Sequence, residues 1–382
     1  MTHLLPFHVR PDDLVSYLRA LTDALDSTGP VLAPYANQAP ELPEVSAIPD
    51  GLALVISTSG STGVPKRAML TRDALIASAD ATLERLSGPG QWLLSMPAHH
   101  IAGIQVLIRS IRSGFDPVQL TTFSIEGFVR ATDRLIAPRR YTSLVPTQLS
   151  WMLDAGEESR AALSSYDAIL LGGAPSPSVL LVTAREAHIH VLTTYGMSET
   201  AGGCVYDGTP LTPTGVNLAD DGRITLTGAT VAAGYLANPD RTATAFGRTR
   251  DGIRTFRTND IGTWQNRQLH VLGRIDDLIN TGGLKVAPRI VEEAATGLSD
   301  VREAVALGLP DDEWGHVVGL AVRARKPLQL QDIRDYLREY LPSYALPRKL
   351  LLAEQLPLRG PGKPDRVALA ETQGWQTLPV HT

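Results

Sequence analysis

The sequence predicts an α/β fold: a large N-terminal domain with parallel sheets and a β-rich segment, followed by a small α+β C-terminal domain. Short apolar runs alternate with helical patterns through the first two-thirds of the chain, which predicts parallel strands covered by helices. Short strands and turns are expected over residues 208–273, and a compact mixed unit from residue 274. The 382 residues suffice for two domains, because single cores stop growing at about 250–300 residues.

The predicted N-terminal strands are apolar runs bounded by glycine, proline or polar turns. They cover residues 52–56, 92–95, 142–145, 168–171 and 190–193. Helical spacing of apolar residues predicts helices at 72–86, 101–113, 148–155 and 178–187. Parallel sheets bind ligands at the carboxyl ends of their strands. The site is therefore expected in the polar or glycine-rich loops 57–66, 172–175 and 195–200.

In the C-terminal part the same reasoning predicts helices at 288–297 and 329–341 and strands at 303–307, 317–323 and 349–352. The second helix has a core-facing stripe, formed by Leu330, Ile333, Leu337 and Leu341. These elements predict a compact α+β unit.

Composition excludes several classes of protein. The 35 basic and 40 acidic residues give a net charge of −5, which argues against nucleic acid as a partner. The one cysteine, Cys204, excludes an internal disulfide and a cysteine zinc cluster, and we interpret it as a small buried residue. Neither a membrane-spanning run nor a signal-peptide pattern is found in the sequence, so a cytoplasmic enzyme is expected.

The strongest local signal is the segment Ser-Thr-Ser-Gly-Ser-Thr-Gly-Val-Pro-Lys at residues 57–66. Such a loop can direct N–H and O–H donors toward phosphate oxygens, and Lys66 adds positive charge. It lacks the Gly-Lys-Ser/Thr ending of a Walker A loop. A flexible surface turn is the alternative interpretation of the segment taken alone.

This segment resembles the phosphate loop of the acyl- and aryl-adenylate-forming enzymes, which include acyl-CoA synthetases, luciferases and peptide-synthetase adenylation domains. The other segments typical of that family follow in its order, at residues 96–103, 171–175, 194–200, 257–260, 273–283 and 362–363. The ordered series is far more specific than any single segment. The resemblance implies an adenylate-forming ligase that uses ATP, Mg²⁺ and coenzyme A with a small-molecule carboxylic acid.

The resemblance also implies which residues bind ATP or AMP. In the family pattern Tyr195 stacks on adenine and Asp260 accepts the ribose hydroxyls, although core packing and a turn aspartate are the ordinary alternatives. The complete predicted set is Thr58, Ser59, Gly60, Ser61, Thr62, Gly63, Lys66, Gly172, Gly173, Ala174, Tyr195, Gly196, Asp260 and Arg274.

The catalytic residues that the resemblance implies are Lys363, Glu199, Thr200 and His100. Attack of a carboxylate on the α-phosphate brings two anions together, so positive charge must be concentrated there, and Lys363 would supply it. Glu199 would hold Mg²⁺, the metal that neutralises the departing pyrophosphate, and Thr200 would meet the α-phosphate. A solvated loop lysine and a helix-start glutamate are the ordinary alternatives.

Residues 1–273 are expected to form the AMP-binding domain, 274–277 a hinge that contains Asp276, and 278–382 a mobile domain that carries Lys363. In the resembling enzymes this domain rotates between two half-reactions, and Gly282 and Gly283 then approach the pantetheine of coenzyme A. Arg67 and Asn259 stand where the family usually has glycine.

Three longer segments, at residues 92–105, 140–149 and 196–208, are similar to the o-succinylbenzoate–CoA ligases of actinobacteria, which act in menaquinone biosynthesis. An aromatic keto-diacid needs a partly apolar pocket with a few polar groups. The predicted lining residues are His100, Gln105, Ser143, Thr147 and Gln148.

Several alternatives stay open at this point. Another acyl- or aryl-CoA ligase would differ only in its pocket. A peptide-synthetase-type adenylation domain is the weaker alternative, because no aspartate that would hold a substrate amine is evident in this sequence. A non-catalytic nucleotide-binding relative has no physical need to keep Glu199, Asp260, Arg274 and Lys363 together. A homodimer is also possible.

Overall fold

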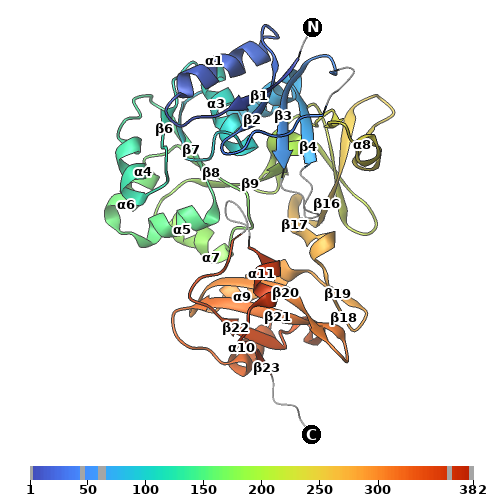
Figure 1. Ribbon diagram of the computed structural model, residues 1–382. Coiled ribbons are helices and arrows are strands. Elements are labelled where there is room, and N and C mark those ends of the chain that lie inside the picture. Colours follow the sequence, from blue (N-terminus) through green and yellow to red (C-terminus); the bar gives the residue numbers. More distant parts are fainter. Residues whose placement is uncertain (1–2, 44–47, 59–65, 359–363, 378–382) are drawn as a thin grey trace.

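The computed structural model describes residues 3–43, 48–58, 66–358 and 364–377. The chain forms a large N-terminal part and a smaller C-terminal part, which lies below it in Figure 1. The two parts touch where the Ser178 hydroxyl donates a hydrogen bond of 3.0 Å to Oε1 of Glu293. Among the described residues no helix is long and apolar enough to cross a membrane.

The first sheet has five strands in the order β1-β2-β3-β4-β14. Its strands are β1 (Leu4–His8), β2 (Val31–Tyr35), β3 (Leu52–Thr58), β4 (Lys66–Thr71) and β14 (Gly234–Tyr235). The first three are parallel, whereas β4 runs back beside β3 and β14 runs antiparallel to β4. Helix α1 (Leu14–Leu25) connects β1 to β2.

The second sheet has seven strands in the order β11-β10-β9-β8-β7-β5-β6. They are β5 (Gln91–Leu94), β6 (Val118–Gln119), β7 (Arg140–Leu144), β8 (Ala168–Leu171), β9 (Val191–Met197), β10 (Gly202–Tyr206) and β11 (Thr209–Pro210). Strands β5 to β9 are parallel, and β10 and β11 are antiparallel additions at one edge. The prediction of a largely parallel sheet is confirmed for this layer.

The helices of this part are α2 (Arg72–Arg85), α3 (Ile101–Ser113), α4 (Ile125–Thr132), α5 (Pro146–Asp154), α6 (Glu157–Ser164) and α7 (Ser178–Glu186). Helix α2 contacts strands of both sheets and α3 contacts strands of the second sheet, and residues of both helices share one hydrophobic core with the two sheets. Helix α3 has the predicted bounds, because Gly114 ends it in the left-handed conformation with φ 71°.

The β-rich segment forms a third sheet, as predicted. It contains β12 (Gly215–Leu218), β13 (Arg223–Thr227), β15 (Phe246–Arg248), β16 (Arg254–Gln265) and β17 (Gln268–Arg274). Helix α8 (Pro239–Ala245) lies between β14 and β15 in the chain. The long hairpin of β16 and β17 leads directly into the C-terminal part (Figure 1).

The C-terminal part is an α+β unit around a six-stranded sheet. Its elements are β18 (Ile279–Thr281), β19 (Leu284–Val286), α9 (Pro288–Thr296), β20 (Val301–Asp311), β21 (Gly315–Ala324), α10 (Leu330–Leu337), β22 (Lys349–Leu352), α11 (Arg366–Glu371) and β23 (Gln376–Thr377). Its core is separate from the cores of the N-terminal part. Helix α10 ends four residues before the predicted Leu341, and Pro342 accounts only for the exclusion of Leu341 itself from helical geometry.

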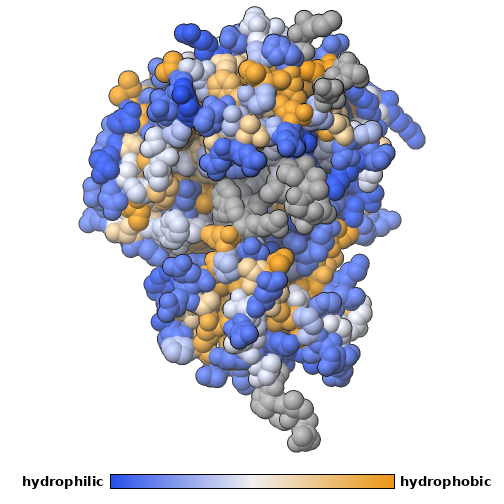
Figure 2. All heavy atoms as spheres, viewed as in Figure 1, coloured by the Kyte–Doolittle hydropathy of each residue, from blue (hydrophilic) through white to orange (hydrophobic). Residues whose placement is uncertain are grey.

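The surface is mostly hydrophilic on the face shown in Figure 2, where hydrophobic residues lie in smaller groups between polar ones. Large apolar side chains exposed by more than half include Val15 at 73% and Ile136 at 86%. Single exposed apolar residues are normal on protein surfaces, so they do not identify a partner.

Candidate active site

Asp260 lies on β16 directly opposite Arg274 of β17. Its side chain is nearly buried, and Oδ2 accepts a hydrogen bond of 2.7 Å from the Tyr195 hydroxyl. Oδ1 lies 3.5 Å from Nη1 of Arg274. The carboxylate predicted to bind ribose is therefore fixed from both sides by residues that were themselves predicted to bind the nucleotide.

Tyr195 is not in a loop, because β9 continues through Tyr195 and Gly196 to Met197. The Tyr195 ring packs against the cluster that contains Cys204 and Ile224. Burial, and next the Asp260 carboxylate, raise the pKa of Tyr195, so the phenol stays protonated and donates. Its role in stacking on adenine stays a prediction.

Glu199 and Thr200 form a short 3-10 turn, Ser198–Thr200, directly after β9. Glu199 is only 8% exposed, and its Oε1 accepts a hydrogen bond of 2.8 Å from the Tyr235 hydroxyl. The Thr200 hydroxyl is fully buried; it accepts from the Met197 N–H at 3.0 Å and donates to the Gly202 carbonyl at 2.8 Å. In this structure Thr200 therefore closes the turn that presents Glu199.

Lys66 starts β4 and pairs with Thr58 at the end of β3. Its Nζ lies 5.6 Å from the centre of the Tyr235 ring. The Arg67 guanidinium donates a hydrogen bond of 2.6 Å to the Glu41 carbonyl, so it is engaged with a neighbouring segment. The predicted phosphate-binding residues Ser59, Gly60, Ser61, Thr62 and Gly63 lie outside the described residues.

Glycines after β8 and within β9 allow two strands to approach closely. A Cβ on Gly172 would lie 2.4 Å from the Thr194 hydroxyl, and Gly173 has φ +82°. On Gly196 a Cβ would lie 2.1 Å from the Gly202 carbonyl oxygen. Ala174 follows the glycines and is half-buried. The predicted adenine loop is therefore next to the strand that carries Tyr195.

The predicted acyl-pocket residues have different environments. His100 caps the start of α3, and its ring centre is 4.2 Å from that of His99, whose pKa burial lowers. Ser143 near the end of β7 is buried, and Thr147 in the first turn of α5 is half-buried. His100 follows β5, a parallel neighbour of β7, so these groups share one edge of the sheet.

Two of the predicted pocket residues, Gln105 and Gln148, form hydrogen bonds with the backbone of the protein itself. The Gln105 side chain is 1% exposed and donates a hydrogen bond of 3.2 Å to the Leu75 carbonyl. Oε1 of Gln148 accepts the Val145 N–H at 3.0 Å, so this amide oxygen serves the start of α5. That helix begins two residues earlier than predicted, because Pro146 fits its first turn.

The segment between the two parts contains a short 3-10 turn, Ile275–Asp277. Oδ2 of Asp276 lies 2.8 Å from Nη2 of Arg274 and accepts a second hydrogen bond of 2.8 Å from Nδ2 of Asn259. Lys363, the predicted catalytic lysine, lies outside the described residues.

Gly282 and Gly283 form the turn between β18 and β19. They have φ +56° and φ +82°, and a Cβ on Gly282 would lie 2.5 Å from the Trp314 ring. A Cβ on Gly283 would meet nothing within 4 Å. In this structure the turn therefore lies against the side chain of Trp314 in its own domain.

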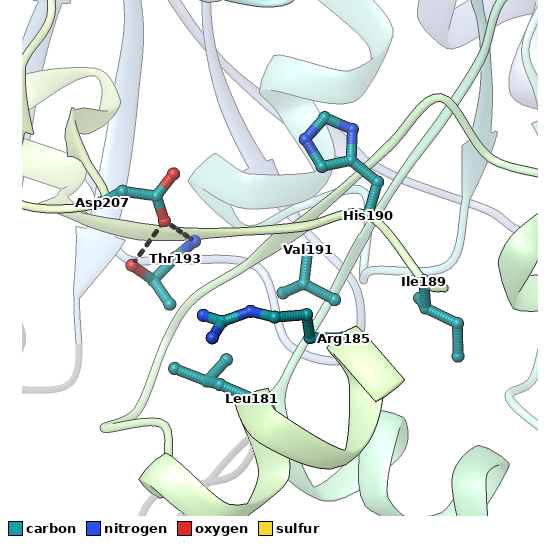
Figure 3. A pocket seen from close by; sticks show the side chains of 7 residues that line it. All are labelled: Leu181, Arg185, Ile189, His190, Val191, Thr193 and Asp207. Atoms are coloured by element: carbon teal, nitrogen blue, oxygen red, sulfur yellow. Dashed lines mark hydrogen bonds between the residues drawn. The ribbon is translucent and has the colours of Figure 1, made fainter. Parts of the chain in front are cut away.

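A hollow beside α7, shown in Figure 3, is separate from this site. It is lined at the beginning of β9 by His190 and Val191, and by Arg185, Thr193 and Asp207 around them. Tyr195, Glu199 and Thr200 lie at or just beyond the other end of β9. Because parallel sheets bind ligands at the carboxyl ends of their strands, the hollow does not belong to the candidate active site.

Two protein-family models match the chain, one in each of its two parts. The model of the AMP-binding enzyme family matches residues 9–236, and that of the AMP-binding enzyme C-terminal domain matches residues 290–363. The chain belongs to the AMP-binding enzyme family. A probable 2-succinylbenzoate–CoA ligase of Mycobacterium tuberculosis is 44% identical over 330 residues, which cover 84% of this chain and 85% of that relative. A 2-succinylbenzoate–CoA ligase of Listeria monocytogenes is 31% identical, with 84% and 70% covered.

Solved structures show the same fold. The o-succinylbenzoate CoA synthetase of Bacillus subtilis, in complex with its acyl-adenylate intermediate, has a TM-score of 0.75 and 26% identity over 94% of this chain and 82% of its own. An amide bond synthetase of Marinactinospora thermotolerans has a TM-score of 0.76 and 25% identity, with 96% and 79% covered. The predicted family and fold are confirmed.

The described residues of this AMP-binding enzyme fit Mg²⁺ bound together with a nucleotide. They contain no group of three or more His, Cys, Asp or Glu side chains that could hold a metal on its own. Mg²⁺ in nucleotide enzymes is commonly bound by one or two carboxylates, water and substrate phosphates. Glu199, a buried carboxylate beside the phosphate-loop strand, has the donor chemistry for such a site.

Sequence reasoning missed two residues of this AMP-binding enzyme, Tyr235 and Arg109. Arg109 is 3% exposed; its guanidinium lies 5.1 Å from the centre of the Trp92 ring and 3.5 Å from the Tyr206 hydroxyl. Among the described residues it forms no ion pair with a carboxylate, and Nε has no hydrogen-bond partner. An arginine within the apolar pattern of α3 was the available signal, whereas nothing local distinguished Tyr235.

Proposed function

We propose that this AMP-binding enzyme is an ATP-dependent 2-succinylbenzoate–CoA ligase that acts in menaquinone biosynthesis. It converts the acid and ATP to an acyl adenylate and pyrophosphate, and then transfers the acyl group to coenzyme A. The names of the Mycobacterium and Listeria relatives support the substrate. The Bacillus synthetase, which has been solved with its acyl adenylate and with ATP and magnesium, supports the chemistry.

In the first half-reaction, an oxygen of the carboxylate attacks the α-phosphate and pyrophosphate leaves. Asp260 and Arg274 hold the ribose end, while Lys66 and the phosphate loop bind the phosphates. Mg²⁺, when bound at Glu199, neutralises charge on the leaving pyrophosphate. Lys363 stabilises the charge that develops between the acyl oxygen and the α-phosphate.

In the second half-reaction, the thiol of coenzyme A attacks the acyl carbon and AMP leaves. For this step we assign residues 1–273 to the nucleotide domain and residues 278–382 to a domain that turns about 274–277. The turn of Gly282 and Gly283 would then move, together with Trp314 of the same domain, toward the pantetheine. A cytoplasmic location and a homodimer stay predictions.

The observation that carries the choice of acid is the 44% identity with the Mycobacterium 2-succinylbenzoate–CoA ligase over 84% of this chain. We also propose that the buried guanidinium of Arg109 pairs with the second carboxylate of the diacid. A buried cation without a counter-charge is unfavourable, and a second carboxylate on the substrate would supply one. Arg109 is nine residues along α3 from His100, about 13 Å at the helical rise. Nine residues are about two and a half helical turns, so Arg109 leaves α3 on the opposite side from His100, where its guanidinium packs on Trp92.

The proposal is tested by pyrophosphate release with ATP, Mg²⁺, coenzyme A and a panel of acids. We expect release with 2-succinylbenzoate and far less with 4-oxo-4-phenylbutanoate, which lacks the aromatic carboxylate. Arg109→Met should lower kcat/KM for the diacid by about 30-fold or more, because losing one partner of a buried charge pair costs about 2–5 kcal/mol. The same variant should change kcat/KM for the monoacid much less.

Lys363→Ala should nearly abolish release, whereas Lys326→Ala, at an exposed lysine paired with Asp300, should not. Strong release with a different acid would keep the ligase and discard 2-succinylbenzoate. If no acid released pyrophosphate although ATP bound tightly, the chain would be a non-catalytic nucleotide-binding relative.

A further inference from the structure

Tyr235 contacts three elements of the N-terminal part: strand β4, helix α8 and the turn that contains Glu199. It ends β14, a two-residue strand that pairs with β4 and places Tyr235 opposite Ala68, two residues after Lys66. Its N–H donates a hydrogen bond of 2.9 Å to the Thr242 hydroxyl of α8. The side chain is 4% exposed, so both backbone and ring are held in one arrangement.

The segment that contains Tyr235 holds Glu199 at two points. The Ala232 N–H donates a hydrogen bond of 2.9 Å to the Glu199 backbone carbonyl. The Tyr235 hydroxyl donates one of 2.8 Å to Oε1 of the Glu199 side chain. A buried carboxylate needs such donors, and hydrogen bonds to charged groups are the stronger kind. The rotamer of Glu199 is therefore set by Tyr235.

The ring of Tyr235 also faces Lys66, whose Nζ lies 5.6 Å from its centre. A cation at this distance is attracted by the electrons of an aromatic ring. Phe246 packs on Tyr235 edge-on, with ring centres 5.1 Å apart at 75°, and fixes the plane of the ring. Tyr235 thus contacts a predicted metal carboxylate through its oxygen and a predicted phosphate-binding cation through its ring.

Glu199 and Lys66 carry opposite charges, but the ion pairs found among the described residues do not join them. If they paired directly, the carboxylate would be less available to Mg²⁺ and the ammonium less available to phosphate. We propose that Tyr235 is a positioning residue that directs Glu199 to the metal ion and Lys66 to the phosphates of ATP. This inference rests on the proposed function, which supplies the roles of Glu199 and Lys66.

The test compares Tyr235→Phe, which removes only the hydroxyl, with wild type and with Tyr166→Phe. Tyr166 has a similarly buried hydroxyl, 2.8 Å from that of Thr132, and serves as the matched control. Binding of Mn²⁺ is measured by electron paramagnetic resonance with the non-cleavable analogue α,β-methylene-ATP. Circular dichroism and thermal melting establish that each variant is folded.

Tyr235→Phe should bind Mn²⁺ in the presence of the nucleotide about 10- to 100-fold more weakly, the usual effect of losing a partner that orients a metal ligand. Binding of the nucleotide without metal should stay within about 2-fold, since the ring remains beside Lys66. Tyr235→Leu, a second variant, should show the same metal defect and also weaker metal-free nucleotide binding. Tyr166→Phe should match wild type in both.

The inference is overturned if either folded Tyr235 variant binds Mn²⁺ as wild type does, or if Tyr166→Phe is equally defective. Neither measurement needs an acid substrate. Failure of every acid in wild type would therefore reject the proposed function, while the metal measurements would still decide the role of Tyr235.

Discussion

Nη2 of Arg274 lies 2.8 Å from Oδ2 of Asp276, and Asp276 belongs to the short segment between the two parts of the molecule. The other end of the same guanidinium faces Asp260. The carboxylate predicted to bind ribose is thus joined to the predicted hinge through one arginine. The Arg274–Asp276 pair is exposed, and exposed ion pairs contribute only about 0–1 kcal/mol, so this contact can bias the position of the C-terminal domain without locking it.

Asn259→Gly tests that bias, since it removes the second hydrogen bond to Asp276. In the present arrangement Arg274 and Asn259 hold Asp276, and Ser178 of the N-terminal part contacts Glu293 of the C-terminal part; we propose that the C-terminal domain leaves this arrangement for acyl transfer. Weakening it should speed thioester formation relative to adenylation by up to about 5-fold, the equivalent of 1 kcal/mol. Single-turnover thioester formation and ATP–pyrophosphate exchange measure the two steps, and a ratio shifted the opposite way would refute this account of Asn259.

Asp260→Ala should raise the KM for ATP by about 10- to 100-fold, because hydrogen bonds to charged groups contribute about 1.5–3 kcal/mol. The KM for the acid should change little. Asp251→Ala, at an exposed turn aspartate, is the control and should leave both values unchanged. Equal effects of Asp260→Ala on the two substrates would indicate a general structural role instead.

Gly196→Ala should lower the free energy of unfolding by about 1–3 kcal/mol, the usual range for overpacking. The new methyl would collide with the Gly202 carbonyl and with Cα of Gly203. Gly215→Ala places a methyl 3.5 Å from Thr227 and should change stability by less than about 0.5 kcal/mol. Urea unfolding of both variants checks the difference; equal stabilities would mean that the strands at Gly196 separate at little cost.

Cys204 should resist alkylation in the folded protein. It is 1% exposed, and burial raises the pKa of its thiol to about 12. Since the pKa lies above its ordinary value, the thiol stays protonated as pH rises from 7 to 9, and the reactive thiolate is scarce. Iodoacetamide at pH 8 should label the protein only after addition of denaturant, whereas rapid labelling of folded protein would contradict its burial.

The sequence predicts the elements best where pattern and local signals agree. Helix α3 combines an amphipathic pattern with Gly114 at its end, and both bounds are confirmed. Strand β9 is longer than predicted, because the pairing of Tyr195 and Gly196 with β10 is a tertiary interaction. Such pairing leaves no periodic signal in the segment itself.

In the candidate site, too, local sequence signals could be used for prediction, whereas contacts between distant segments could not. Motif order predicted roles for Glu199, Asp260 and Arg274, because a family pattern depends on sequence, and these roles stay predictions. The motifs could not show that Gln148 serves its own helix or that Tyr235 reaches Glu199 from 36 residues away. Contacts between distant segments depend on how the sheets pack, so they had to be found in the structure.

The central claim is that the acid is activated as an acyl adenylate. The most direct measurement uses 2-succinylbenzoate labelled with ¹⁸O in its carboxylates, together with ATP, Mg²⁺ and coenzyme A. Because a carboxylate oxygen attacks the α-phosphate and leaves with AMP, mass spectrometry should find one ¹⁸O atom in AMP alongside 2-succinylbenzoyl-CoA. Thioester formed with unlabelled AMP, or with ADP and phosphate instead of AMP, would contradict the account.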